Sequence, residues 1–570
     1  MFIKVTKSGS RRYAQLVESF RNDAGQPRQR TVCTLGRLEA GGEVDTLISA
    51  LQRARGLDVV CQRPPLEGLR FIDSRCAGDV WVLWQLWRSL GFDELAAAWR
   101  RSRVEADVLA CLRAMVFNRL CDPGSKLGVL RWLDTVALPV NFGFADGPPQ
   151  HQHLLRAMDV LDEHSAALGT RLATLMRPLI DEDLSVVFYD LTTVEVSGQA
   201  VVADDVRVHG QSKSGLVARQ FVLSLVQTAE GLPIAHEVHP GNIAEAKTLL
   251  PMIKSLLARY PLKRVVLVAD RGLLSVNNLD ELTKLRATLA SKGRTVSLEY
   301  ILAVPAARYG EFADALRALA ADQQADKPWV AQTTWQQRRL VIAHDPEVAA
   351  RWTQARNTAI AELLALGQQW GGKLDAQDAG ARRRGRPLSD SGAKARFYHA
   401  VKDAHLAHLI KIDLQAETFS FTIDEDKQRY LELLDGKLLL VTNTDAPAVE
   451  VVQRYKSLAD IERGFRVLKS DIEIGPVYHR LPQRIRAHAL VCFMALILYR
   501  VMRMRLKLNQ REESPSRLIE QLQRIQQQTV KTADGQTLHG LTDITPAQKS
   551  LFAVLHLPAP TPAELSKTLL

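Results

Sequence analysis

The sequence predicts a multidomain α+β protein with a mixed α/β sheet at its centre, and three observations support this fold class. The chain has 570 residues, a length that suggests two to four domains. Residues 184–304 run as three strands, a helix, a strand, a helix and a strand, an order typical of a sheet covered by helices. A strand-like segment at residues 1–36 and a helical period at 77–180 precede this part.

These changes of pattern divide the chain into six expected parts. They are a small basic β unit (1–40), a helical DNA-binding region (75–182), the first part of a core (183–305), an insertion domain (306–425), the second part of the core (426–510) and a C-terminal tail (511–570).

The first part combines β structure with positive charge. Strands are predicted at 2–6, 13–20 and 29–35, with turn residues between them. Residues 1–30 contain seven Lys or Arg against two acidic residues. This charge fits either nucleic-acid binding or an ordinary solvated surface. The helical region that follows is interrupted by Pro and Gly at 122–124 and 147–149.

In the central part, two strands are expected to end in an aspartate. The strand at 184–189 ends in Asp190 and the strand at 264–269 ends in Asp270. Open α/β sheets place their active sites at the carboxyl ends of strands. The other elements expected there are strands at 220–228, 233–239 and 300–304 and helices at 244–257 and 276–289.

Beyond residue 305 the alternation is interrupted and then returns. The elements expected are strands within 329–343, a helix at 346–370, an exposed Gly- and Arg-rich loop at 371–392, a strand at 437–442, helices at 447–469 and 484–508, and a tail with one helix at 515–528.

Composition narrows the function classes. The net charge of +11 and a pI of about 9.3 favour an anionic polymer as partner. Six dispersed cysteines suggest neither a zinc site nor a disulfide framework, and a reducing cytoplasm, with the protein associated with the nucleoid, fits best. The longest apolar run, 489–499, is too short to cross a bilayer, so we expect no membrane association.

A third acid lies on the predicted helix at 447–469. Tyr455, Glu462 and Lys469 repeat every seven residues and would share a line at the border of the apolar stripe. Mg²⁺ prefers oxygen ligands, and two such ions about 4 Å apart can activate an attacking oxygen and stabilise a leaving one. If Asp190, Asp270 and Glu462 hold them, their Cβ atoms should lie within roughly 10 Å of each other. A helix edge with an ordinary Glu–Lys surface pair explains the same pattern without a metal.

Several strings resemble one family. Phe188-Tyr189-Asp190-Leu191-Thr192-Thr193 and Ala269-Asp270-Arg271-Gly272 are similar to the first two acidic motifs of insertion-sequence DDE transposases. Tyr455, Glu462 and Lys469 resemble the Tyr-x2-Arg-x3-Glu-x6-Lys signature of one branch, with Leu458 in place of its Arg. Weaker similarities are His209-Gly210-Gln211-Ser212-Lys213, Gly241-Asn242, Asp435-Gly436-Lys437, Thr442-Asn443, Pro476-Val477-Tyr478-His479 and parts of 13–35 and 118–133.

This resemblance implies a ribonuclease H-like catalytic core interrupted by an insertion domain, with Asp190, Asp270 and Glu462 as catalytic residues that bind two Mg²⁺, for which Mn²⁺ can substitute. It implies metal-dependent cleavage at transposon ends and strand transfer into target DNA. The expected partner is double-stranded DNA, both terminal inverted repeats and target, bound by a homodimer. Leu458 leaves the family's hairpin intermediate an open question.

Further residues are expected to contact DNA. Tyr455, Lys469 and Arg466 would hold phosphates, and Arg271 either assists near the metals or pairs with a carboxylate. Arg384 and Arg386 lie in a Gly-Arg-Pro segment similar to an AT-hook, although an ordinary basic loop is the simpler interpretation.

Two other functions remain compatible with the residues. A metal-dependent nuclease with the same core would cleave without joining strands, and a repressor derived from a transposase would bind DNA without cleaving it. The basic N-terminal part and the long insertion favour the transposase over the nuclease, and three intact acids favour it over the repressor.

Overall fold

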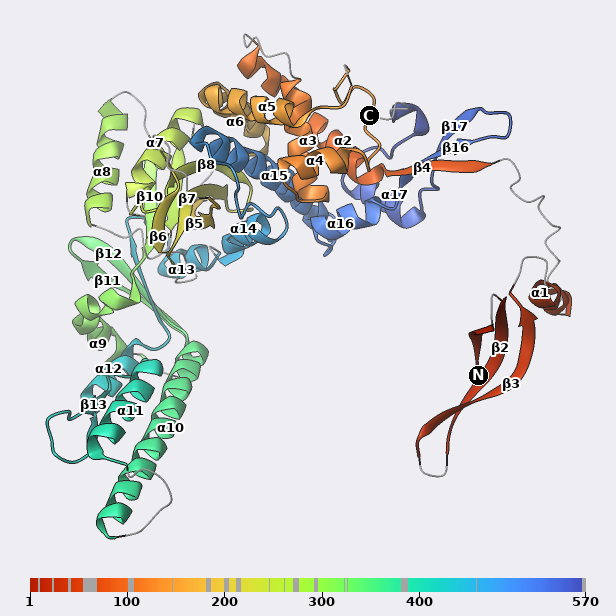
Figure 1. The fold of residues 1–570 in the computed structure, drawn as a ribbon. Helices are drawn as coiled ribbons and strands as arrows, with labels where there is room; N and C mark the ends of the chain where they lie inside the picture. The colour runs from red at the N-terminus through yellow and green to blue at the C-terminus, as the bar shows by residue number, and fades with distance from the viewer. Residues whose placement is uncertain are drawn as a thin grey trace. The chain divides into compact units, whose positions relative to one another are not determined.

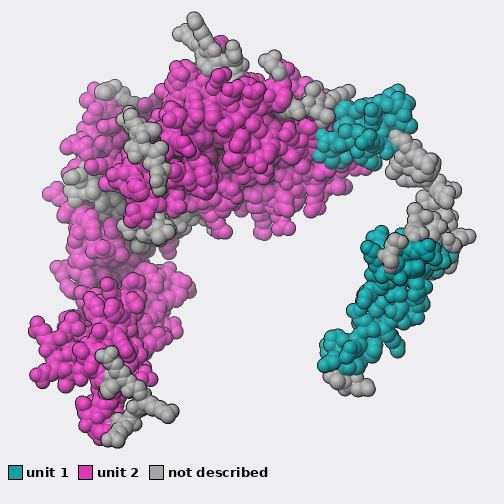
Figure 2. Space-filling model, in the orientation of Figure 1, with its two compact units in different colours: residues 1–74, 528–540 teal, residues 75–527, 541–570 magenta. Residues whose placement is uncertain are grey.

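The computed structural model describes all residues except 9–10, 23–24, 39–42, 55–68, 101–106, 146, 181–185, 199–204, 212–216, 245–246, 261, 270–275, 292–295, 322, 325, 381–387, 458 and 566–570. It forms two compact units (Figure 2). One contains residues 1–74 and 528–540, and the other contains residues 75–527 and 541–570.

The smaller unit is built mainly from β structure. β1 (Phe2–Ser8), β2 (Arg11–Arg21) and β3 (Pro27–Arg37) form an antiparallel sheet, and α1 (Glu43–Ala54) follows. The three strands predicted in residues 1–36 are confirmed.

A second small sheet has the strand order β17-β16-β4. Its strands are β4 (Arg70–Cys76), β16 (Gln526–Lys531) and β17 (Thr537–Leu541). The prediction of one tail helix at 515–528 was wrong. Helix α16 (Pro515–Leu522) ends before β16 begins, and α17 (Pro546–Val554) and the short η6 (Pro562–Glu564) follow β17.

The helical region of the larger unit begins at residue 78. Its elements are α2 (Gly78–Ser89), η1 (Phe92–Trp99), α3 (Val108–Cys121), α4 (Lys126–Leu133), α5 (His151–Glu163), α6 (Ser165–Met176) and η2 (Arg177–Leu179). Asp107 and Ser125 cap α3 and α4 with their side chains, which explains why the chain restarts as helix there. The long helix α15 (Pro482–Leu508) packs against α3 and α5.

Helix α15 is longer than the apolar run at 489–499 that it contains, so length alone does not exclude that it crosses a membrane. It has 27 residues and, among the described helices, is long and apolar enough to cross a membrane. However, 89% of its most apolar window is buried inside this chain, as expected for a core helix.

The central sheet confirms the mixed α/β pattern (Figure 1). The strand order is β11-β12-β15-β10-β9-β5-β7-β6, and β8 also pairs with β7. β5 runs parallel to β9, and β9 runs parallel to β10, while the other pairs are antiparallel. The strands are β5 (Val186–Glu195), β6 (Val208–Gln211), β7 (Val217–Thr228), β8 (Pro233–Pro240), β9 (Arg264–Ala269), β10 (Ser297–Ala303), β11 (Trp329–Trp335), β12 (Arg338–His344) and β15 (Lys437–Thr442).

Helices cover both faces of this sheet (Figure 1). On one face lie α7 (Leu249–Arg259) and, packed beside it, α8 (Val276–Ser291). The Tyr189 hydroxyl of β5 donates a hydrogen bond to the hydroxyl of Thr248, the residue before α7, at 2.5 Å. On the other face, α13 (Ala448–Lys456) buries Val451 and Val452 against the strands. Helix α7 begins later than the predicted residue 244.

The segment predicted as an insertion is only partly separate from the sheet. β11 and β12 extend the sheet through β15, so the expectation that residues 329–343 leave it was wrong. η5 (Ala306–Phe312) and α9 (Ala313–Ala321) precede β11. The residues after β12 form α10 (Pro346–Asp378), α11 (Asp390–Asp403), β13 (Ile410–Ile412), β14 (Phe421–Ile423) and α12 (Glu425–Leu434). This group has its own apolar cluster around the buried Phe397.

The predicted loop at 371–392 is shorter than expected. Helix α10 continues to Asp378, and α11 begins at Asp390 after Ser389 caps it. Gly371 and Gly372 lie inside α10, and within the described part of the chain a Cβ at either position would meet only open space, so no close contact requires glycine there. The exposed-loop prediction for 381–387 lies outside the described residues.

Candidate active site

Asp190 lies within a strand and not at its end, which corrects the sequence prediction. β5 continues to Glu195 because β7 pairs with it from Val187 to Glu195, with Asp190 opposite Leu225. Its parallel pairing with β9 ends earlier, at Tyr189 opposite Ala269. Asp190 therefore immediately follows the end of the parallel ladder, where a carboxylate can face a site beside the sheet.

The Asp190 side chain belongs to the face of the sheet that α13 covers. Side chains alternate along a strand, so Asp190 shares a face with Phe188. Phe188 belongs to the apolar cluster under α13, with Val266, Val268, Ile301, Ala303, Val341, Ala343, Leu440, Val451 and Val452. Asp190 is half-buried, and one carboxylate oxygen accepts the backbone N–H of Leu191 at 2.7 Å.

The predicted helix at 447–469 is two helices. α13 ends at Lys456 with Ser457 as its C-terminal cap, and α14 spans Ala459–Ser470. The prediction that Tyr455 shares one helical line with Glu462 and Lys469 was therefore wrong. Tyr455 is half-buried at the end of α13, against the apolar cluster under that helix.

Helix α14 carries Glu462, Arg466 and Lys469. It contacts β5 and buries Phe465 and Leu468, whereas Arg466 and Lys469 are exposed. The backbone of Glu462 is helical, but its side chain lies outside the described part of the structure. Because Glu462 and Lys469 are two turns apart, about 10.5 Å along the helix, they are too distant for a direct ion pair.

The structure thus brings the Asp190 strand next to the Glu462 helix. Four other predicted residues, Asp270, Arg271, Arg384 and Arg386, lie outside the described residues, as does Leu458. The expected spacing of the three Cβ atoms stays a prediction. Among the described side chains, no group of three His, Cys, Asp or Glu is arranged to hold a metal.

Two glycines of the family-like strings have a structural role. Gly241, after β8, lies against Gln220 of β7, whose side-chain amide donates to the Gly241 carbonyl at 2.9 Å. A Cβ at Gly241 would lie 2.0 Å from the Gln220 carbonyl oxygen, and one at Gly210 of β6 would lie 2.3 Å from the Gly241 carbonyl oxygen. Only glycine permits this approach, which packs β6, β7 and the end of β8 together beside β5.

The strings around β15 are also structural. Asn443 accepts the backbone N–H of Tyr300 at 2.7 Å and donates to the Leu298 carbonyl at 3.2 Å, which fastens β15 to β10. Asp435 forms an ion pair with Arg356 and accepts a hydrogen bond from Thr353 of α10 at 2.7 Å. In the sequence these residues stand out only by their resemblance to the family, and the structure supplies a physical reason for them.

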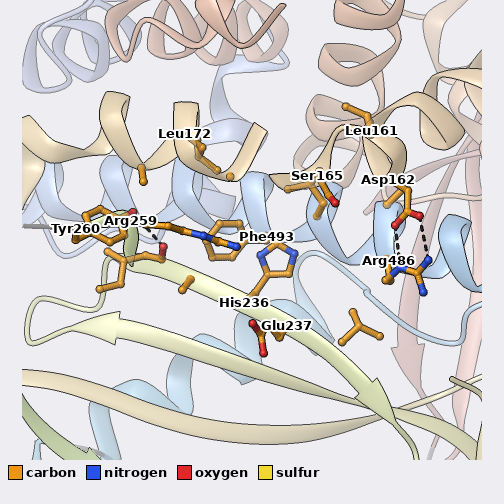
Figure 3. Close-up of a pocket in the computed structure, with 17 residues that line it drawn as sticks. Leu161, Asp162, Ser165, Leu172, His236, Glu237, Arg259, Tyr260, Arg486 and Phe493 are labelled. Atoms are coloured by element: carbon orange, nitrogen blue, oxygen red, sulfur yellow. Dashed lines mark hydrogen bonds and ion pairs between the residues drawn. The ribbon is translucent and has the colours of Figure 1, made fainter. Parts of the chain in front are cut away.

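A cavity of about 230 Å³ lies between β8, α5, α6 and α15 (Figure 3). His236 stacks on Phe493 with ring centroids 4.3 Å apart, and burial, with Arg259 nearby, lowers the pKa of His236 to about 3. Burial also raises the pKa of Glu237. Arg486 pairs with Asp162 at 2.8 Å. A neutral, stacked His236 on a strand separated from β5 by β7 makes this a packing cavity, distinct from the Asp190 site.

Two further strings, at 118–133 and 476–479, line a separate and larger cavity that contains the cations Arg119, Lys126 and Arg484. Sequence reasoning assigned these residues no chemistry. The available signal was the density of basic residues beside Pro–Gly breaks where helices begin, at 122–126 and 475–484.

Comparison with protein families identifies two parts of the chain. Residues 3–61 match the model of the IS1634 family transposase N-terminal domain. Residues 181–498, more than half of the chain, match the transposase DDE domain model. No curated protein is similar enough to the chain to count as a match.

Proposed function

Since this chain belongs to the DDE transposase family and is a DNA transposase, we propose that Asp190, Asp270 and Glu462 form its catalytic centre. The single observation that carries the assignment is the position of Asp190, just past the parallel pairing of β5 with β9 and on the strand that α14 contacts. Asp270 follows Ala269, the last residue of β9, and Glu462 belongs to α14. All three lie within the matched residues 181–498.

The donor chemistry fits Mg²⁺. Three carboxylates offer hard oxygen ligands, and one of them, Asp190, is half-buried beside an apolar cluster where a carboxylate gains from a cation. Two bound Mg²⁺, or Mn²⁺ in their place, supply activation of the attacking oxygen and stabilisation of the leaving oxygen. The three carboxylates hold the ions, and the sheet and α14 fix their positions.

The other residues of α13 and α14 act on the DNA. Arg466 and Lys469 are exposed on the same helix as Glu462, so their charges face incoming phosphates. Tyr455 is held by apolar packing at the end of α13, and its phenol contacts a phosphate oxygen. Arg271 acts beside the metals, and Arg384 and Arg386 contact DNA beyond the core.

We further propose a ribonuclease H-like core. In support, β5, β7 and β8 form an antiparallel meander, and β9 and β10 follow in parallel on the other side of β5. The helical region 75–182 and the basic unit 1–40 bind transposon-end DNA, residues 345–436 form the insertion beyond β12, and a homodimer holds the two ends.

The test is a strand-transfer assay with purified protein, a duplex of the terminal repeat and supercoiled target DNA. We expect Mg²⁺-dependent joining of the duplex to the target, abolished by EDTA and restored by Mg²⁺ or Mn²⁺. Cleavage without joined product would instead indicate a nuclease. Binding without cleavage would indicate a repressor, and either result would contradict the proposal.

Replacing Lys469 by Ala should weaken binding to end DNA. Because Lys469 is exposed on the Glu462 helix, it neutralises one phosphate, and its loss should make the salt dependence of binding shallower by about 0.9 in log–log slope. Titrations at several salt concentrations measure this. Lys549→Ala, an exposed lysine on α17, is the control. If Lys469→Ala and wild type show the same salt dependence of binding, Lys469 is an ordinary surface lysine that does not contact DNA.

A further inference from the structure

A cationic cavity of about 700 Å³ opens in the larger unit. It is lined by the end of α3, the starts of α4, α5 and α15, and the segment that joins α14 to α15. Among the described residues, four cations line it, Arg119, Lys126, Arg480 and Arg484, against one carboxylate, Glu473. Of these, Arg484 is already paired with Asp159 at 2.8 Å.

Two of these cations are buried among neutral partners. Arg119 is 4% exposed and Lys126 is 5% exposed. Arg119 donates to the backbone carbonyls of Gly124, Ile472 and Glu473, and its Nε has no hydrogen-bond partner among the described residues. The Lys126 ammonium lies 3.5 Å from Nδ1 of His488. Within the described residues neither cation forms an ion pair, and Glu473, the carboxylate on the cavity wall, meets Arg119 only through its backbone carbonyl.

Two neighbouring histidines, His479 and His488, add no charge. Burial and the nearby Lys126 lower the pKa of His479 to about 3 and that of His488 well below its usual value. Burial and Arg119 lower the pKa of Lys126 to about 7. Burial is the largest cause of all three shifts and the neighbouring cations add to it, so this site disfavours positive charge that has no anionic partner. A bound anion would relieve that cost, because buried charges are stabilised by an opposite charge.

Helix geometry favours an anion as well. Three helices begin at this cavity, α4 at Lys126, α5 at His151 and α15 at Pro482. Side-chain caps occupy some first-turn N–H groups of α4 and α5, but the start of each helix keeps a partial positive charge, so each of these helices adds to the attraction for an anion.

The cavity is connected to the strand that carries Asp190. Val477, on its wall, pairs with Val196 just after β5, and the Val477 N–H donates to the Glu195 carbonyl at 3.1 Å. Val196 is six residues beyond Asp190, so the part of the cavity wall at Val477 lies about 20 Å from Asp190 along the strand direction. That length corresponds to about six base pairs at 3.4 Å each, within reach of one duplex.

We infer that this cavity binds a backbone phosphate of the transposon-end DNA, with Lys126 and Arg119 as its buried cations and Arg480 at its exposed rim. The inference rests on the proposed function for its substrate, but it concerns a site separate from the three acids. The phosphate would lie about 20 Å from the cleaved bond and fix the register of the DNA.

The test uses the full-length protein and a duplex of the terminal repeat in which single phosphates are replaced by uncharged methylphosphonates. With wild type, one linkage some base pairs from the cleavage site should weaken binding about tenfold when neutralised. In Lys126→Met the parent duplex should bind about tenfold less tightly with a salt slope shallower by about 0.9. In this variant, neutralising the same linkage should have little further effect, because the phosphate has lost its partner.

Two further variants make the result specific. Lys394→Met removes a lysine that is 6% exposed but donates to the Ala416 carbonyl in the part beyond β12, so it should keep the wild-type pattern. Arg480→Glu changes an exposed rim residue, so it should fold normally and weaken binding more than tenfold. Thermal melting measures whether the variants fold, and because Met replaces a buried charge by an apolar side chain of similar volume, we expect both Met variants to fold.

A folded Lys126→Met that keeps the wild-type affinity, salt slope and sensitive linkage would overturn the inference, and so would a wild type without any sensitive linkage. If wild type still cleaves and joins DNA in these cases, the proposed function stands and only the cavity assignment falls. If wild type neither binds nor cleaves the end duplex, the proposed function and the inference fail together.

Discussion

Asp190→Asn should reduce cleavage of transposon-end DNA roughly a thousandfold, equivalent to about 4 kcal/mol of transition-state stabilisation. Asn keeps the shape of the side chain and can still accept the Leu191 N–H, but it removes the negative charge that a metal ion needs. DNA binding should stay close to wild type, because affinity comes mainly from Lys and Arg contacts to phosphates. Single-turnover cleavage and a binding titration without Mg²⁺ measure the two quantities separately.

The matched control is Glu195→Gln, which makes the same chemical change on the same strand. Glu195 lies five residues beyond Asp190 with an exposed side chain, and it should retain cleavage within a few fold of wild type. If Asp190→Asn cleaves DNA at the wild-type rate, Asp190 is not a metal ligand and the proposed catalytic centre is wrong. Equal loss of binding and cleavage in that variant would place the defect in folding and not in the chemistry.

Gly241→Ala should destabilise the larger unit by roughly 3 kcal/mol. The added Cβ would lie 2.0 Å from the Gln220 carbonyl oxygen and 2.6 Å from that of Val208, so β6 and β7 must separate to admit it. β7 is the direct neighbour of β5 in the sheet, so its displacement reaches the strand that carries Asp190. Thermal melting should show a transition several degrees lower, and cleavage should be lost at a lower temperature than in wild type.

Gly372→Ala tests the same substitution where space is available. Gly372 lies inside α10, and no described atom lies within 4 Å of the Cβ that alanine would add, so alanine should stabilise the helix by about 0.5–1 kcal/mol. Opposite shifts in melting temperature for the two variants are therefore expected. A Gly241→Ala protein as stable as wild type would show that the close approach of β6, β7 and residue 241 is not required.

The sequence by itself determined the helices and strands that depend only on the pattern of neighbouring residues. The apolar runs of β9 and β15 gave their bounds as the structure has them, and the strands of residues 1–36 followed from alternation and turn residues. It also determined which acids to consider, because Asp190 and Asp270 each follow an apolar run and Glu462 lies at the border of an apolar helical stripe. The residues that match the transposase DDE domain, 181–498, include all three acids.

Tertiary structure decided the features that depend on partners distant in sequence. β5 continues past Asp190 because β7 pairs with it, and β11 and β12 join the sheet because β15, about a hundred residues later, offers an edge. The helical spacing of apolar residues continues across the break between α13 and α14, so the sequence does not show where one helix ends. The break arises because α13 packs on one apolar cluster and α14 on another. The cavity at Lys126 joins segments that are more than three hundred residues apart in the chain. Backbone pairing and the burial of charge are satisfied between such segments, so no periodicity within either one can reveal them.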